Sequence, residues 1–394
     1  MSLSQTDSPI WQDAALVRRA LEVGAQFADK VIETARVIAM VAAPTNDERD
    51  RAVLVADLFQ THGASDVSID SIHDVVGRLK GTSSEKALLL AAHTDTVFSR
   101  ETVLKIHQDD QRAYGPGLGD NSLGVASVVL LPDMLQALGV TPATDILLTG
   151  NVGEEGLGNL RGITQVLTDH ADVGAVIAVE GQNLGRITHI AVGSVRLRVT
   201  VTGPGGHSWG DFGNPSAIHA AARLIEQLDR IPLTQSPKTT LNVGMISGGI
   251  SINSIAPKVT FDVDLRSTDA TALKRVVDRV YAALASRDER ITVEPEVLGK
   301  RPAGQVAVTS RIVVAAAEIL RSLSYSPAAD ASSTDANAAI AMGLPAVCIG
   351  LTTGGNAHRL DEYIDLAPVK TGLAQLMLLS LAVSNDLAQG RLSP

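Results

Sequence analysis

The segment Ala87-Leu88-Leu89-Leu90-Ala91-Ala92-His93-Thr94-Asp95 decides the fold class of this 394-residue chain. Its first six residues are all apolar, which is typical of a strand buried on both faces, as in parallel sheets covered by helices. Two more short apolar runs follow, at 146–149 and 175–179, and helical patterns separate the three runs. This alternation of strands and helices predicts an α/β fold with a mostly parallel sheet flanked by helices.

The pattern then changes. Residues 195–201 and 261–265 alternate between apolar and polar side chains, which predicts strands with one face in water. Helical patterns lie between and after these strands. We therefore expect a smaller α+β sandwich at 189–300, inserted into a large domain that residues 1–188 and 301–394 form together.

Composition indicates a folded, acidic protein and excludes several partners. Hydrophobic residues make up 45% of the chain and charged residues 19%, which excludes a disordered protein. The formal net charge is −10, and an acidic surface repels nucleic acid and anionic membranes. No apolar stretch reaches the roughly 18–20 residues of a membrane span, and the first residues lack the basic region of a secretory signal. With a single cysteine, Cys348, no intrachain disulfide can form, and we expect a cytoplasmic protein.

Acidic and imidazole side chains follow the predicted strands at the points where these end. They are His93, Asp95, Asp120, Glu154, Glu155, Glu180 and His358. Ligands bind at the carboxyl ends of the strands in open α/β sheets, so the loops would bring these side chains to one edge. So many acids repel one another without a counter-charge, whereas three carboxylate ligands suit two divalent cations, with neutral imidazoles completing the shells. The sequence therefore predicts a two-metal site.

The spacing within two pairs of this set predicts different roles for the two residues of each pair. His93 and Asp95 point the same way in an extended segment, so Asp95 can accept the second ring N–H of His93. Glu154 and Glu155 can point in different directions, so that one holds metal while the other acts as a general base. Taken singly, a histidine at a strand end or a Glu-Glu pair is most often an ordinary polar residue or a solvated turn. The conjunction of all these residues favours the metal site.

Three motifs resemble the signatures of one enzyme family. Residues 91–97, 115–121 and 153–156 resemble, in this order, three signatures of the dinuclear-metal aminoacylase/carboxypeptidase family. This family includes acetylornithine deacetylase, succinyl-diaminopimelate desuccinylase, glutamate carboxypeptidase and peptidase T. Glu180 and His358 occupy the places of its remaining two ligands, so the resemblance spans almost the whole chain. It implies a zinc-peptidase-like catalytic domain with an inserted lid domain, through which the protein forms a homodimer.

The resemblance also implies how the metals are held. Asp120 would bridge two divalent ions. His93 and Glu180 would complete the shell of one ion, and Glu155 and His358 would complete the shell of the other. Zinc is the expected metal, with manganese and cobalt as alternatives because carboxylates outnumber imidazoles in the set.

By the same resemblance, Glu154, Asp95 and His207 are catalytic. Glu154 would shuttle the proton and Asp95 would hold the histidine ligand. Residues 206–210 also fit the G-x-S-x-G elbow of serine hydrolases, but an elbow needs a helix directly after the serine, and 211–215 intervene. In the resembled family this segment lies in the lid, and its histidine donates to the oxyanion of the tetrahedral intermediate, often across a dimer.

Three further residues match positions that contact substrate. Asn253 and Arg266 correspond to lid residues that bind the substrate's terminal carboxylate or the intermediate, and a planar guanidinium suits such an anion. The alternative is that Arg266 only pairs with Asp262 or Asp264 on the wet face of its strand. Gly355 would bring backbone close to the substrate.

Two polar segments are predicted to cap helices. Thr45 and Glu48 fit a capping box, in which the hydroxyl and the carboxylate satisfy free amides at a helix start. Residues 332–335 open a second helix and are predicted to cap it.

Together these features predict a metal-dependent hydrolase of an amide or peptide C–N bond, with a metal-activated water and Glu154 as the general base. The substrate would be a small molecule or short peptide with a carboxylate. One alternative is an aminohydrolase that releases ammonia from an arylamine or amidine, and another is a metal-stabilised binding protein without activity. The substrate side chain, the acyl group, the metal and the subunit that supplies His207 stay open at this point.

Overall fold

The computed structural model describes residues 9–83, 85–285 and 288–392. The chain divides into two compact units, which are considered separately below. The large unit consists of Met1–Ile190 and Gln305–Pro394, and the inserted unit consists of Ala191–Gly304.

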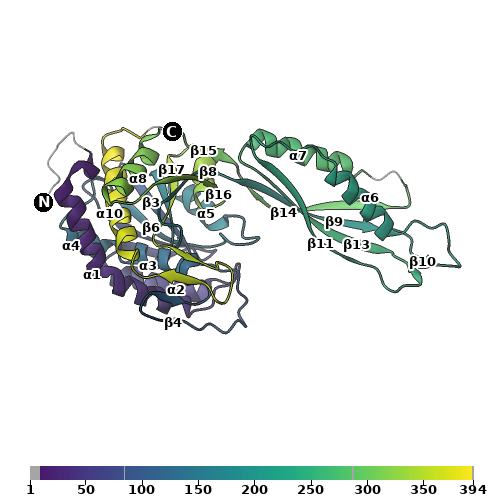
Figure 1. The fold of residues 1–394 in the computed structure, drawn as a ribbon, viewed down its shortest axis with the longest axis horizontal. Coiled ribbons are helices and arrows are strands. Elements are labelled where there is room, and N and C mark those ends of the chain that lie inside the picture. Colours follow the sequence, from purple (N-terminus) through teal and green to yellow (C-terminus); the bar gives the residue numbers. More distant parts are fainter. Residues whose placement is uncertain (1–8, 84, 286–287, 393–394) are drawn as a thin grey trace. The chain divides into compact units, whose positions relative to one another are not determined.

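A nine-stranded sheet forms the core of the large unit (Figure 1). In spatial order its strands are β1 (Ser65–Ile69), β2 (Val75–Leu79), β6 (Ile146–Asn151), β3 (Ala87–His93), β7 (Val173–Glu180), β17 (Ala346–Gly350), β8 (Arg186–Ala191) and β15 (Gly304–Gln305), with β16 (Ala328–Ser332) beside β8. The central strands β6, β3, β7 and β17 run parallel. Strand β3 is buried along its whole length, as its apolar run predicts. The predicted α/β class is confirmed.

Helices of the large unit pack on this sheet. They are α1 (Ala14–Ala39), α2 (Arg49–Thr61), α3 (Leu123–Val129), α4 (Leu131–Leu138), α5 (Arg161–Asp169), α8 (Arg311–Ser322), α9 (Ala336–Ala341) and α10 (Val369–Ala388), with a short 3-10 turn η1 (Ile10–Gln12) before α1. Helices α3 and α10 contact β3 and β7, and α1 packs against both of these helices. Helix α10 is apolar and buried along most of its length, so it belongs to the core rather than to the surface.

One predicted helix is divided. The helical pattern between the first two apolar runs consists of a π-helical turn, η2 (Leu118–Ser122), followed by α3 and α4. Pro132 stands in the first turn of α4, where its missing N–H cannot continue the hydrogen bonds of α3. None of the described helices is long and apolar enough by itself to cross a membrane, although α3, taken with the turn before it, and α4 together pass that test as a pair bent by 49°.

A small second sheet connects two loops of the large unit. Its strands are β18 (Gly354–Gly355), β19 (Tyr363–Asp365), β5 (Arg112–Tyr114) and β4 (His107–Gln108). Residue Tyr363 pairs with Tyr114 and Gly355 pairs with Tyr363, all antiparallel. This pairing brings the Gly-rich loop at 115–120 beside the loop that carries His358.

The inserted unit is an antiparallel sheet with two helices. The strand order is β11 (Thr239–Gly248), β13 (Lys258–Ser267), β9 (Gly193–Thr202) and β14 (Thr292–Arg301). Helices α6 (Ala217–Asp229) and α7 (Ala270–Ala283) pack on the face that the alternating apolar residues of β9 and β13 form. A two-residue ribbon joins β10 (Gly206–His207) to β12 (Ser254–Ile255).

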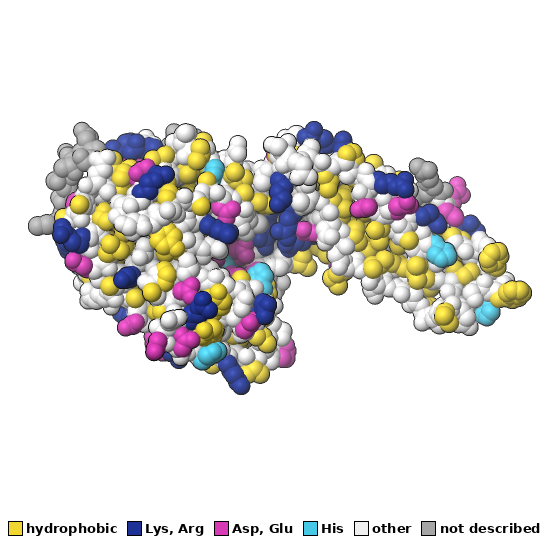
Figure 2. All heavy atoms as spheres, viewed as in Figure 1, with side chains coloured by type: hydrophobic (Ala, Val, Ile, Leu, Met, Phe, Trp, Pro, Cys, Tyr) yellow, Lys and Arg dark blue, Asp and Glu magenta, His cyan; other side chains and the backbone are white. Residues whose placement is uncertain are grey.

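The inserted unit also exposes large apolar side chains (Figure 2). They are Trp209, Phe212, Met245, Ile246, Ile250 and Ile252. Several of them lie in the loops next to the β10–β12 ribbon, so the surroundings of His207 are apolar as well as exposed.

Candidate metal centre

Five of the predicted residues form two groups of potential metal ligands, and Asp120 belongs to both. The first group is His93, Asp120 and Glu180, and the second is Asp120, Glu155 and His358. Within each group the potential ligand atoms all lie within 4.8 Å of one another. The Asp120 Oδ1 atom is 3.2 Å from His93 Nε2, and its Oδ2 atom is 3.1 Å from His358 Nε2. One carboxylate thus presents a different oxygen to each group, which is the arrangement that a bridging ligand needs.

The chemistry of this donor set fits two divalent cations. Two imidazole nitrogens and three carboxylates are ligands that zinc and related ions accept, and three negative charges approach the charge of two such ions. Zinc, manganese and cobalt all suit such a mixed set of nitrogen and oxygen donors.

Strand register explains why these residues meet. His93 is the last residue of β3 and Glu180 the last residue of β7, and the two strands are parallel neighbours. The side chain of Asn121 then ties the Gly-rich loop to β7, because its Nδ2 donates to the Val179 carbonyl at 2.7 Å and its Oδ1 accepts from the Gly181 amide at 2.9 Å. These two bonds flank Glu180 and hold Asp120 beside it.

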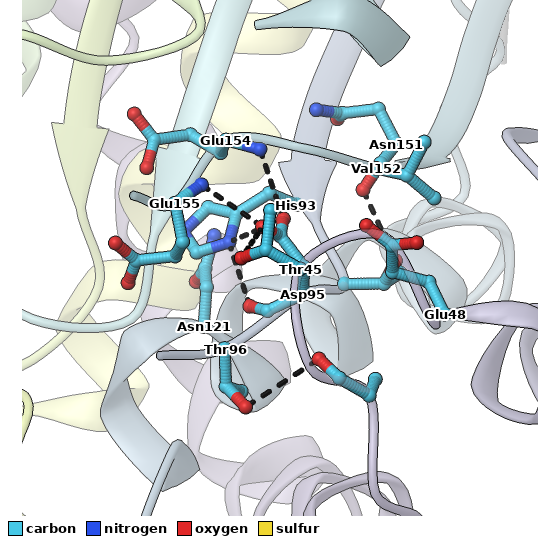
Figure 3. Close-up of polar contacts among 12 residues, drawn as sticks. Thr45, Glu48, His93, Asp95, Thr96, Asn121, Asn151, Val152, Glu154 and Glu155 are labelled. Carbon is cyan, nitrogen blue, oxygen red and sulfur yellow. Dashed lines mark hydrogen bonds and ion pairs between the residues drawn. The ribbon is translucent and has the colours of Figure 1, made fainter. Parts of the chain in front are cut away.

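The turn after β6 presents two buried glutamates (Figure 3). The backbone amides of Glu154 and Glu155 both point at the Asp95 carboxylate, and their side chains extend away from it. The Glu155 Oε1 atom is 3.0 Å from His358 Nε2. Glu154 is only 7% exposed and belongs to neither ligand group. It lies next to the candidate ligands without being one of them.

Asp95 meets the His93 ring through its backbone and, at a longer distance, through its carboxylate. His93 Nδ1 lies 3.2 Å from the backbone carbonyl oxygen of Asp95 and 3.6 Å from the carboxylate oxygen Oδ1 of the same residue. The carboxylate instead accepts from the Glu154 amide through Oδ1 and from the Glu155 amide through Oδ2, each at 2.9 Å. The backbone of Asp95 therefore holds the histidine ring, and its carboxylate holds the glutamate turn.

The capping box predicted at Thr45 and Glu48 is wrong. The Thr45 hydroxyl donates to Asp95 Oδ2 at 2.8 Å, and the Glu48 carboxylate accepts two bonds from Arg161 and one from the Asn46 amide rather than from the Thr45 amide. Helix α2 begins at Arg49 without a side-chain cap. The reason is tertiary, because the Thr45 amide donates to the Thr96 carbonyl and so draws this segment onto the loop that carries Asp95. Thr45 is a site residue that the sequence analysis missed.

The cap predicted at 332–335 is divided between two residues. Thr334 Oγ1 accepts from the Ala336 amide at 3.3 Å, which is a cap-like bond at the start of α9. Asp335 makes no cap bond and accepts from Asn151 Nδ2 at 2.8 Å. Asn151 pairs with His93 in the sheet, so Asp335 supports the strand ends at this edge.

Charges at the centre shift the pKa values of both histidines. Hydrogen bonds to Asp120 and Glu155 raise the pKa of His358 to about 10. Burial alone would lower the pKa of His93, but Glu180 and Asp120 raise it well above its ordinary value. Burial also raises the pKa of Glu180, to about 7. Both imidazoles therefore carry a proton at pH 7 in the metal-free protein.

Metal binding at pH 7 is expected to release roughly two to three protons per chain, because the ions bind only neutral imidazoles and an ionised Glu180 carboxylate. Protons compete with the metal below the raised pKa values, so the observed affinity should rise as the pH rises from 6 to 8. Calorimetric titration of metal-free protein with Zn²⁺, in two non-chelating buffers of different ionisation enthalpy, measures this release. A binding enthalpy that is the same in both buffers would contradict the expectation.

His207 and Asn253 lie together in the inserted unit. His207 is in β10 and Asn253 directly precedes β12, and the Ser208 amide donates to the Asn253 carbonyl at 2.9 Å. His207 Nδ1 accepts from the amides of Trp209 and Gly210, each at 3.2 Å. Because these partners are donors, the neutral ring carries its proton on Nε2, which leaves an exposed N–H donor. Helix α6 does not begin until Ala217, so the serine elbow lacks its helix.

Arg266 and Gly355 have structural partners. Arg266 Nε donates to Asp264 Oδ2 at 2.7 Å, which is the pairing that the sequence analysis left open as an alternative. A Cβ atom on Gly355 would lie 2.9 Å from the Tyr363 hydroxyl, so the contact between β18 and β19 by itself accounts for a glycine there.

Two family models match this chain. The model for Peptidase family M28 matches residues 74–186, which include His93, Asp120, Glu155 and Glu180. The model for the Peptidase dimerisation domain matches residues 191–292 of the inserted unit.

Curated relatives and solved structures agree with these matches. The chain is 26% identical over 330 residues to acetylornithine deacetylase of Myxococcus xanthus, covering 76% of this chain and 80% of that enzyme. It is 23% identical over 346 residues to succinyl-diaminopimelate desuccinylase of Corynebacterium glutamicum, covering 85% of this chain and 91% of that enzyme.

The fold is shared with two solved structures. A tripeptidase from Staphylococcus aureus has a TM-score of 0.77 at 21% identity, over 91% of this chain and 99% of that chain. An aminopeptidase from Bacillus cereus has a TM-score of 0.76 at 20% identity, over 90% of this chain and 98% of that chain. The resemblance predicted from the motifs is confirmed. By these matches the chain is a metallohydrolase similar to the M20/M28 peptidases, and acetylornithine deacetylase and succinyl-diaminopimelate desuccinylase are among its relatives.

Proposed function

We propose that this metallohydrolase cleaves an amide or peptide C–N bond next to a carboxylate, as a peptidase or an N-acyl-amino-acid deacylase. The observation that carries the proposal is the sharing of Asp120 between two ligand groups, with Glu154 buried beside them and outside both. The ligands would be His93 and Glu180 on one side and Glu155 and His358 on the other. Two divalent ions, zinc in the first place, would lower the pKa of a water and polarise the carbonyl when bound.

Glu154 is the general base in this proposal. Its carboxylate belongs to neither ligand group, and in this role it takes a proton from the attacking water and delivers it to the leaving nitrogen. Asp95 contributes by fixing the Glu154 amide, and Thr45 contributes by fixing Asp95. A carboxylate that is held from its backbone can accept and return a proton without a large movement.

His207 is the oxyanion donor in this proposal. Two backbone amides fix its ring with Nε2–H outward, and a preoriented N–H donor stabilises the negative oxygen of a tetrahedral intermediate. Asn253 lies directly before β12, where its carbonyl accepts from the Ser208 amide, and would contact the same part of the substrate. Arg266 would bind the substrate carboxylate if that anion competes with Asp264 for the guanidinium. The matched dimerisation domain supports a homodimer through the inserted unit.

A substrate panel with controlled metal content tests this function. Chelator-treated protein is reconstituted with Zn²⁺, Mn²⁺ or Co²⁺ and offered N-acetyl and N-succinyl amino acids, dipeptides, tripeptides, arylamines and amidines. We expect release of an amine from an N-acyl amino acid or a peptide, loss of this activity on chelation, and its return with added metal. Blocking the substrate carboxylate as an amide should lower kcat/KM about tenfold or more, because a charged hydrogen-bond partner is lost.

Two results would contradict the proposal. Ammonia as the only product would favour the aminohydrolase alternative, and turnover that survives complete metal removal would exclude the two-ion site from the reaction. The relatives named above support hydrolysis of an amide bond, since the names of two of them describe removal of an acyl group.

A further inference from the structure

A buried glutamate that the proposed reaction does not use lies under the Gly-rich loop. Glu362 is fully buried, and its carboxylate accepts three backbone hydrogen bonds. Oε2 accepts from the Gly117 amide at 2.9 Å, and Oε1 accepts from the amides of Gly119 and Asp120 at 2.7 and 2.8 Å. The side-chain amide of Gln182 adds a longer contact to Oε1, at 3.3 Å. All of these partners are donors, which favours the ionised carboxylate, whereas burial and the charge of Asp120 raise the pKa of Glu362 to about 8.

The conformation of the loop allows its amides to converge on this carboxylate. Gly117 has φ +69, a left-handed conformation that glycine adopts without strain. A Cβ atom on Gly119 would lie 2.6 Å from the Gln182 side chain, so a larger residue would push the loop away from its partner. Successive amides that point inward form a concave anion site in many proteins, where a phosphate often binds. Here the chain supplies the anion itself.

Glu362 also connects the loop to the second histidine ligand. It follows His358 by four residues in a tight turn, in which the Glu362 amide donates to the Arg359 carbonyl at 3.1 Å. The Glu362 carbonyl in turn accepts from the Gly115 amide at 2.8 Å. The backbone and the side chain of one residue thus fasten the segment with His358 to the segment with Asp120. The same two segments carry Asp120 Oδ2 and His358 Nε2, which lie 3.1 Å apart.

We propose that Glu362 is a positioning residue for the metal centre: its carboxylate fixes the Asp120 amide so that the two oxygens of Asp120 face His93 and His358 at once. This inference rests on the proposed function, because it assumes that Asp120 bridges two ions. Glu362 touches none of the candidate ligand atoms, so its contribution is to the geometry and affinity of the site rather than to the chemical step. Partners of metal ligands typically change metal affinity about 10–100-fold when they are removed.

Glu362→Gln tests the proposal with little change in volume. The substitution puts an NH₂ group in place of one accepting oxygen. In either orientation of the glutamine amide, this NH₂ group faces a backbone N–H, of Gly117 on one side or of Gly119 and Asp120 on the other, so at least one hydrogen bond is lost. We expect Zn²⁺ affinity of at least one site to fall about tenfold or more in calorimetric titration of the metal-free protein. The visible spectrum of the Co²⁺-loaded protein should change as well, because it reports ligand geometry.

Asp145→Asn is the matched control. Asp145 is also a buried carboxylate that accepts from a glycine amide, that of Gly81 at 2.8 Å, and it belongs to neither ligand group. Its substitution should lower the melting temperature while leaving both metal affinities within about twofold of wild type, as expected for a partner outside the ligand network. Glu362→Asp serves as a second variant, since it keeps the charge but is too short to reach all three amides.

The outcomes separate this inference from the proposed function. If wild-type protein binds no divalent ion, the proposed function fails and this inference fails with it. If wild type binds two ions and folded Glu362→Gln or Glu362→Asp binds both with unchanged affinity and spectrum, this inference alone is overturned. Failure of both variants to fold would also overturn it, because Glu362 would then determine the fold rather than the ligand geometry.

Discussion

Replacing Glu154 by glutamine is expected to lower kcat about 10³-fold while both metal ions stay bound. Glu154 lies outside both ligand groups, so its loss removes no ligand. Glutamine has nearly the same shape but cannot accept a proton from water at neutral pH, and a positioned general base contributes about 10²–10⁴-fold to the rate. The measurement is steady-state kinetics on the best substrate of the panel, together with elemental analysis of the same preparation.

Glu155→Gln is the matched control for this experiment. Glu155 is the next residue, is about as buried, and donates from its amide to the same Asp95 carboxylate, but it belongs to the group around His358. Its substitution should weaken one metal site and lower activity through that loss, so added metal should restore part of the rate. Excess metal should restore nothing in Glu154→Gln. A Glu154→Gln protein with wild-type kcat would remove Glu154 from the chemistry.

Periodicity is the reason that the fold could be predicted. The run at 87–92 indicates a doubly buried strand, and the alternation at 195–201 indicates a strand with one wet face; both appear as expected in β3 and β9. The carboxyl ends of parallel strands share one edge of the sheet. The predicted topology alone therefore places His93 near Glu180. The ligand groups follow from that topology.

The network around the ligands could not be predicted, because its hydrogen bonds join residues far apart in the chain. Thr45 matches a local capping pattern, but its hydroxyl bonds to Asp95, 50 residues away. The sequence shows only the local pattern, and the tertiary contact is stronger. Glu362 stands among polar residues that look like a solvated turn, yet the amides it binds lie 242, 243 and 245 residues before it. No local signal marks such a residue.

The pairing of Asp95 with His93 shows a finer limit. The i, i+2 spacing correctly places both residues at the site, but it does not say whether the side chain or the backbone of Asp95 meets the ring. The glutamate turn offers two free amides, and a buried carboxylate is stabilised more by two amide donors than by one imidazole at 3.6 Å. The ring then bonds to the carbonyl oxygen.

Asp120→Ala is expected to reduce the metal content from two ions per chain to one or none and to abolish measurable turnover. Asp120 presents one oxygen to each ligand group, so its loss takes a ligand from both sites at once. Burial would raise the pKa of Asp120, but His358 and His93 lower it below its ordinary value, so the carboxylate is charged throughout the neutral range. Elemental analysis after dialysis against a trace of free Zn²⁺ measures the loss, and Asp278→Ala, an exposed acid on α7, is the control for handling.

Comparison with single-site variants decides whether Asp120 is a bridge. Glu180 belongs only to the group with His93, so Glu180→Ala should weaken that ion and spare the other. Glu155 belongs only to the group with His358, so Glu155→Ala should do the reverse. If Asp120 is a bridge, Asp120→Ala lowers the metal affinity of both sites. The loss at each site should exceed the loss that Glu180→Ala or Glu155→Ala causes at the one site to which that glutamate belongs. If Asp120→Ala instead weakens one site and leaves the second at wild-type affinity, Asp120 is an ordinary terminal ligand, and the two groups are independent sites that lie close together.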